Sequence, residues 1–306
     1  MANTFITPSV LARNALATLY NTIVLAGLIH RDYDAAFNGH VGDTITVRIP
    51  TTFSVDEFDR NNGIQIQTAT ESSFTVQLDT IPDVSFEVTT EDMELEISEF
   101  NAQLMTPAME AMAQYIDGTL AEALVDQAQG SHTGSPAGAG AYVGDGTTTP
   151  NQAWRDARSI LSRNKHPLSQ RVAVLSPEAV SDALGDDLFV TANESGSTDG
   201  LREASLGRKF GFDNYESQVF GYGSGDKGGA DGVAFHRDAI TLASRTLAVP
   251  QGAAYATTES YKGLGIRVVK GYDLTYKKEV VSLDMLIGVT DVRGDACVEL
   301  DFGQGS

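Results

Sequence analysis

The chain has 306 residues, and its hydrophobic content of 42% is typical of folded globular proteins that bury a sizeable core. The formal net charge is −20 and the sequence shows no local basic face, which argues against sequence-specific binding of nucleic acid. One cysteine, no signal-peptide pattern and no membrane-length apolar run exclude disulfide-stapled, Sec-secreted and helical membrane proteins.

The first forty residues predict an arm built around an amphipathic helix. Pro8 can occupy the first helical position after Thr7. Apolar residues then recur at helical spacing, and they are Leu11, Ala15, Leu19 and Ile23. Such a terminal helix folds back onto its own core or lies on a neighbour, and the spacing is compatible with both.

Residues 42–88 change to the two-residue alternation of β-strands. The alternating segments are "DTITVRIP", "FTVQL" and "VSFEV". The first two segments predict a long hairpin, whose tip carries Asp56, Glu57, Asp59 and Arg60. Because the tip has little apolar material to fold back onto a core, we expect it to project.

The strongest helical pattern covers residues 98–129 and predicts a long structural helix. Pro107 is expected to reset or kink this helix near its start. The predicted apolar stripe comprises Leu104, Ala108, Met112, Tyr115, Ile116, Leu120, Ala123 and Leu124.

A Gly-, Ser- and Thr-rich stretch follows, and then a compact α/β segment. A helix is predicted from Pro150, with Trp154, Ala157 and Leu161 on one face. The strand "RVAVL" comes next, and then a helix capped by Ser176. The last seventy-five residues read mainly as strands, with Cys297 as a small buried apolar position in the final one, "ACVEL".

Residues 206–217, "LGRKFGFDNYES", hold two glycines around a pair of cations. A phosphate-binding loop needs a lysine and a hydroxyl directly after the second glycine, where this chain has Phe212 and Asp213. The glycines, Gly207 and Gly211, instead predict a tight turn with positive φ angles. The side chains expected to pack beneath this turn are Phe210, Phe212 and Tyr215.

No catalytic or metal-binding constellation emerges from the motifs. The five histidines form no zinc motif, and the sequence has no G-x-S-x-G elbow and no EF-hand spacing. His236 with Asp238 could be a base and its orienting carboxylate, but a surface or interface histidine is the stronger interpretation. We therefore expect no enzyme activity, no cofactor and no metal.

The order of these elements resembles the major capsid (coat) proteins of tailed bacteriophages. Five segments carry the resemblance, and they are "MANTFITPSVLARNAL", "HRDYD" with "GDTITVRIP", "SLGRKFGFDNYES", "GVAFHRDAITLA" and "GLGIRVVKGYDLTYKKEVVSLDMLIGVTDVRGDACVELD". The family implies an α+β, Hong Kong 97-type capsid fold, which herpesvirus capsid floors and encapsulins share. It also implies an icosahedral shell of pentamers and hexamers around double-stranded DNA.

The resemblance also implies a division of the chain into five parts. Residues 1–40 would be the N-terminal arm, 41–90 the extended loop with flanking peripheral strands, and 91–130 the spine helix of the peripheral domain. Residues 131–255 would form the α/β axial domain. Residues 256–306 would return through the peripheral sheet to the axial core.

The expected contacts are between copies of the chain. We expect inter-subunit contacts from the hairpin-tip residues Asp56, Glu57, Asp59 and Arg60, and from Arg202, Arg208 and Lys209. In some members of the family, a lysine of the extended loop forms an isopeptide bond that cross-links the shell. Because residues 41–90 contain no lysine, we expect this shell to be held together non-covalently. The chain starts directly at the arm, which predicts a separate scaffolding protein.

Further expected partners are a portal protein and a decoration or cement protein, with packaged DNA nearby only non-specifically and no membrane. The protein would assemble in the host cytoplasm and reside in the virion. Two alternatives remain, an encapsulin-type nanocompartment shell and an unrecognised soluble hydrolase using His236.

Overall fold

The computed structural model describes most of the chain. The described residues are 8–33, 42–49, 72–88, 104–128, 142–143, 149–186, 206–220, 231–252, 255–261, 264–273 and 278–300, with Phe53, Val55, Glu57, Arg60 and Ile66. The helices are α1 (Pro8–Thr22), the 3-10 helix η1 (Leu25–Gly27), α3 (Thr106–Ala128), α4 (Pro150–Arg163) and α5 (Pro177–Leu184). No helix among these residues is long and apolar enough to span a bilayer.

The strands form four sheets within the described residues. A four-stranded antiparallel sheet has the order β10 (Tyr255–Tyr261), β11 (Leu264–Asp273), β12 (Lys278–Asp284) and β3 (Asp83–Val88). A six-stranded mixed sheet has the order β4 (Tyr142–Val143), β14 (Cys297–Leu300), β8 (Gly232–His236), β5 (Arg171–Leu175), β7 (Phe212–Glu216) and β6 (Arg208–Lys209). The two-stranded sheets are β1 (Thr44–Ile49) with β2 (Ser72–Gln77), and β9 (Ile240–Arg245) with β13 (Leu286–Asp291).

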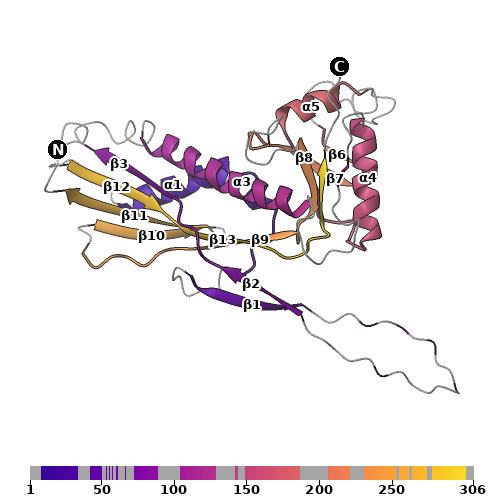
Figure 1. The fold of residues 1–306 in the computed structure, drawn as a ribbon. Coiled ribbons are helices and arrows are strands. Elements are labelled where there is room, and N and C mark those ends of the chain that lie inside the picture. The colour runs from indigo at the N-terminus through magenta and orange to yellow at the C-terminus, as the bar shows by residue number, and fades with distance from the viewer. Residues whose placement is uncertain are drawn as a thin grey trace.

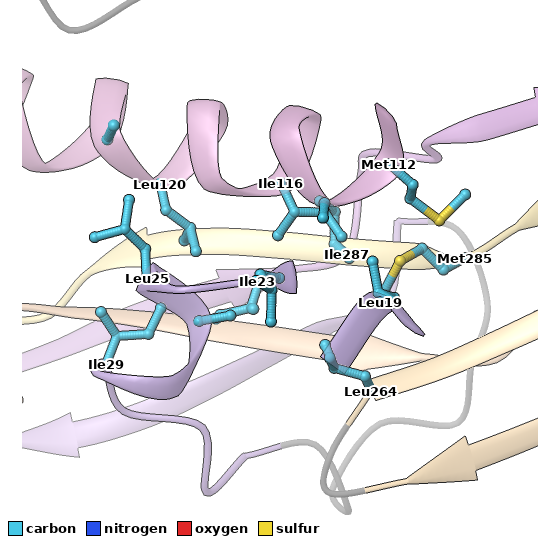
Figure 2. Packing of buried hydrophobic residues seen from close by; sticks show 14 of the residues in the cluster. Leu19, Ile23, Leu25, Ile29, Met112, Ile116, Leu120, Leu264, Met285 and Ile287 are labelled. Atoms are coloured by element: carbon cyan, nitrogen blue, oxygen red, sulfur yellow. The ribbon is translucent and has the colours of Figure 1, made fainter. Parts of the chain in front are cut away.

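The arm helix α1 folds back onto its own chain. Pro8 opens it, as predicted, because the proline ring fixes φ near the helical value. Ala15, Leu19 and Ile23 are buried at the predicted spacing. α1, η1 and α3 share one core with the four-stranded sheet. Figure 1 shows α1 and α3 beside this sheet, and Figure 2 shows Leu19 and Ile23 of the arm below the α3 residue Ile116.

Helix α3 confirms the predicted long helix but begins at Thr106, directly before Pro107. Residues 98–103 lie outside the described residues. Met112, Ile116 and Leu120 of the predicted stripe are buried, whereas Tyr115 is 42% exposed. That assignment was wrong because Tyr115 lies one residue, about 100° around the helix, away from Ile116 and falls at the edge of the buried face.

The predicted hairpin is confirmed by the antiparallel pairing of β1 with β2, from Thr44 opposite Gln77 to Ile49 opposite Ser72. Beyond it, residues 78–80 pass close to β13, where Thr80 and Ile287 exchange two backbone hydrogen bonds. Gly288 permits this approach, since a Cβ there would collide with the carbonyl oxygen of Gln77. The hairpin base is therefore fixed to the central strands.

The six-stranded sheet separates two cores. On one face, Val174 and Val233 join the core that contains α1 and α3. On the other face, Ala173 and Leu175 pack against α4 and α5. In α4 the predicted residues Trp154, Ala157 and Leu161 are all buried, and Ser176 caps α5 by accepting a hydrogen bond from the Ala179 N–H (3.1 Å).

The two glycines have the positive φ angles that were predicted, with Gly207 directly before β6 and Gly211 in the turn between β6 and β7. Gly207 has φ 53° and Gly211 has φ 93°. Phe212 is fully buried and Phe210 packs partly against the α4–α5 core, as expected. Tyr215 is 43% exposed, so its predicted packing was wrong, because it lies three residues from Phe212 on β7 and therefore points to the opposite face of the sheet.

Candidate assembly surfaces

The segment between β1 and β2 presents charged and apolar side chains to solvent. Glu57 and Arg60 are exposed, while Asp56 and Asp59 lie outside the described residues. Val55 is 99% exposed and Ile66 92% exposed, with Phe53 at 65%. Because large apolar side chains gathered in one segment at such exposure indicate a binding surface, this segment has the character of an interface.

The cations of the β6–β7 turn are partly engaged within the chain. The Arg208 guanidinium lies 3.4 Å from a carboxylate oxygen of Asp213, and both side chains remain about half exposed. Lys209 is half-buried, and Arg202 lies outside the described residues. An exposed pair of this kind contributes little to stability, so Arg208 can exchange its partner at low cost.

A buried carboxylate on α3 holds the arm, and sequence reasoning missed it. Asp117 accepts hydrogen bonds from the backbone N–H groups of Val24 (2.8 Å) and Leu25 (3.1 Å) at the start of η1. Burial raises the pKa of Asp117 to about 6 from 3.8, and the N–H groups only partly offset it. The signal was a lone aspartate inside the apolar stripe, between Ile116 and Leu120.

The carboxyl-terminal end of α3 is tied to two turns of the neighbouring sheets. The side-chain amide of Gln127 donates to the carbonyl oxygens of Ala239 and Arg293, at 3.0 Å each. The Cys297 thiol donates to the Leu124 carbonyl (3.3 Å). Burial raises the pKa of this thiol well above its usual value, which is consistent with the predicted packing role.

His236 is buried, so the predicted surface histidine was wrong. It is 3% exposed, and its ring stacks on that of His166 with the ring centroids 6.1 Å apart. The His236 Nδ1 atom accepts a hydrogen bond from the Asp238 backbone N–H (3.2 Å), and burial lowers the pKa of the ring. The strand register that pairs His236 with Arg171 carries it inside the fold.

The histidine pair has the contacts of a packed polar pair. His166 Nε2 lies 3.3 Å from an Asp295 carboxylate oxygen, and the proximity of this imidazole holds the pKa of Asp295 below the usual range. Among the described residues, no group of three histidine, cysteine, aspartate or glutamate side chains could hold a metal ion.

The comparison with protein families decides the class of the protein. The family described as phage capsid protein matches residues 71–280, well over half of the chain. This chain belongs to the phage capsid protein family. A search of curated proteins finds no match.

Solved phage capsid structures share the fold of this capsid-family chain. A structure from Mycobacterium phage Che8 has a TM-score of 0.65 at 18% identity, and the match covers 90% of each chain. A capsid structure of cyanophage P-SCSP1u has a TM-score of 0.65 at 13% identity, covering 92% of this chain and 88% of the other. The mature capsid of bacteriophage PhiM1 has a TM-score of 0.59 at 14% identity, covering 86% and 83%.

These similarities establish an α+β capsid fold of the Hong Kong 97 type, as the sequence resemblance implied. A virus-like particle from Pyrococcus furiosus is also similar, with a TM-score of 0.50 at 11% identity, covering 96% and 98%. An encapsulin-type shell is the less favoured alternative, because the family match and the structures with higher TM-scores are from phages. Family and fold identify a structural protein, a component of virion capsids that assembles in many copies.

Proposed function

We propose that this chain is the major capsid protein of a tailed bacteriophage, forming the pentamers and hexamers of an icosahedral shell around double-stranded DNA. The observation that carries the proposal is the family match over residues 71–280, on a chain whose fold parallels solved phage capsids over about nine tenths of its length.

The physical basis of such a shell is many moderate contacts between identical copies. A closed symmetric assembly multiplies weak interfaces, so each contact can dissociate and correct errors before the shell is complete. The exposed Phe53, Val55 and Ile66 support an extended loop that lies on a neighbouring copy. In this proposal Glu57, Arg60, Arg208 and Lys209 contribute charged contacts at these interfaces, together with Asp56, Asp59 and Arg202.

We further propose that the shell is non-covalent and uses accessory proteins. Residues 41–90 contain no lysine, so no side-chain amine is available there for an isopeptide bond. A separate scaffolding protein would guide assembly in the host cytoplasm, and a portal protein and a decoration or cement protein would be further partners of the shell. The net charge of −20 suits a container that holds DNA without gripping its phosphates.

The test is to express the full-length chain, alone and with neighbouring structural genes, and to examine it by sedimentation velocity and electron cryomicroscopy. We expect megadalton closed shells with pentameric and hexameric units, and no covalent cross-links on denaturing gels. A chain that remains monomeric or dimeric under every such condition would overturn the proposal. Shells filled with protein cargo in place of DNA would favour the encapsulin alternative.

A further inference from the structure

Helix α4 carries a cationic face that the sequence alone did not reveal. Its buried side packs on the six-stranded sheet, and the opposite side is exposed. This exposed side, with the turn that follows, carries four cations, and they are Arg155, Arg158, Arg163 and Lys165. We call these four residues the α4 cationic face. It is unexpected in a chain with a net charge of −20.

The cationic face is not neutralised by the described part of the chain. None of its four side chains makes an ion pair with a described residue, and Asp156 is the one acid among the exposed positions of α4. A further arginine lies just beneath. Arg171 is buried, and its guanidinium donates to the carbonyl oxygens of Pro167 (2.8 Å) and His166 (2.8 Å) with no carboxylate contact.

Helix α5 carries the opposite charge. Glu178 and Asp182 lie four residues apart, so they share one face of the helix, and both are exposed. No ion pair joins these two carboxylates to α4 or to any other described residue. We call Glu178 and Asp182 the α5 acidic face.

The two faces lie on neighbouring helices of the same domain, and the cationic face runs along α4 and the turn that follows, from Arg155 to Lys165. The turn holding Lys165 leads into the start of β5, at Arg171, whereas α5 begins directly after β5 ends at Leu175. A strand of this length spans about 16 Å, at roughly 3.3 Å per residue. Opposite charges carried by two different helices of one domain suit a head-to-tail contact, in which one copy presents its cations to the acids of the next.

We propose that the α4 cationic face of each subunit binds the α5 acidic face of a neighbouring copy around the ring of a capsomer. This inference rests on the proposed function, because it names a contact of the capsid shell. The charges specify how each subunit is oriented relative to its neighbour in the ring, and they raise the rate at which copies associate. A heterologous contact that repeats by rotation closes into a ring, as pentamers and hexamers require.

A second copy fits the cationic face better than DNA does. A polyanion approaching α4 would meet the exposed Asp156 on the helix and the Glu178 and Asp182 carboxylates on the same domain. It would also meet the repulsion of a chain with net charge −20. A neighbouring subunit presents a discrete acidic patch and carries the complementary cations itself.

The experiment compares three full-length variants. R155E/R158E reverses the cationic face, E178R/D182R reverses the acidic face, and the quadruple variant exchanges the two. The quadruple variant keeps the wild-type net charge of −20, so it separates local complementarity from total charge. Far-ultraviolet circular dichroism and thermal melting of the unassembled protein check that each variant is folded, and the substituted side chains are exposed.

We expect each double variant to need on the order of tenfold more protein to assemble, because like charges then face each other. The quadruple variant should recover assembly to near the wild-type concentration. Normal assembly of R155E/R158E would overturn the inference, and so would a quadruple variant that is not rescued. Shells that form normally but lose packaged DNA would assign the cationic face to the genome instead. All these outcomes presuppose wild-type shells, whose absence would contradict the proposed function itself.

Discussion

At the scale of single residues, Asp117 is the group whose chemistry most directly ties the arm to α3. Its carboxylate is 4% exposed and binds two backbone N–H groups where the arm turns into η1. If the arm lifts off α3, the carboxylate returns to water and to an ordinary pKa. Docking of the arm is therefore linked to protonation of Asp117.

The sign of this linkage follows from the direction of the shift. Because burial raises the pKa of Asp117 to about 6, its protonated form stabilises the docked arm. That contribution is complete below pH 3.8 and is lost as the pH rises through about 6. We expect the free energy of unfolding of the wild type to gain about 2 kcal/mol between pH 7 and pH 4.5 relative to Asp117→Asn.

Urea denaturation of the unassembled protein at the two pH values measures this difference. The asparagine variant is the matched control, because it keeps the shape of the side chain and every other titrating group. Parallel pH profiles for the two proteins would contradict the assigned role of Asp117.

Sequence patterns predicted residues whose role depends on local backbone or local burial. Ser176 as a helix cap and Gly207 and Gly211 at positive φ need only their immediate neighbours to be inferred. Asp117 and His236 were missed or misassigned because their partners, Val24 and His166, are brought near only by the fold. Residue pairs that are distant in sequence leave no periodic signal.

At the scale of elements, periodicity predicted most helices and strands but not the sheets to which they belong. The alternation around Val84 and Phe86 identified β3, yet it could not show that β3 pairs with β12, nearly two hundred residues later. Similarly, β9 and β13 form a separate two-stranded sheet, although 40 residues or more of chain separate them. Such long-range pairings depend on tertiary packing, which a single sequence does not encode as a local pattern.

The close approach of β13 to the hairpin base makes a test at this scale. Gly288→Ala places a methyl group against the backbone of Gln77 and Leu78, so strands must separate. We expect a loss of about 3 kcal/mol or more in the free energy of unfolding, or failure to fold. Gly252→Ala is the control, because a Cβ there meets nothing within 4 Å and φ is not positive.

Thermal and urea denaturation of the wild type and of both glycine variants measure these differences in the free energy of unfolding. Gly252→Ala should remain within about 0.5 kcal/mol of the wild type. Equal stability of the two variants would show that the hairpin base is not held tightly against β13.

At the scale of the whole molecule, the chain exposes in isolation what a shell would cover. Val55 and Ile66, between β1 and β2, are almost completely exposed and contribute little to the fold of one subunit. We expect Val55→Asp with Ile66→Asp to leave the melting temperature of the unassembled chain unchanged while raising the protein concentration needed for assembly about tenfold or more.

Light scattering during assembly, with melting curves of the unassembled protein beside it, makes this measurement. The double substitution to serine is the milder companion and should fall between the wild type and the aspartate variant. Unimpaired assembly of the aspartate variant would remove the exposed apolar segment from the interface.

Cys297 gives this molecule an intrinsic reporter. As the only cysteine of the chain, fully buried and bonded to the Leu124 carbonyl, its sulfur can react with a thiol reagent only when α3 parts from β14. The rate at which a thiol reagent labels Cys297 therefore measures how often the contact between α3 and β14 opens. Comparing the Cys297 labelling rate of free subunits with that of assembled particles would show, without an engineered probe, whether assembly slows local opening of each subunit.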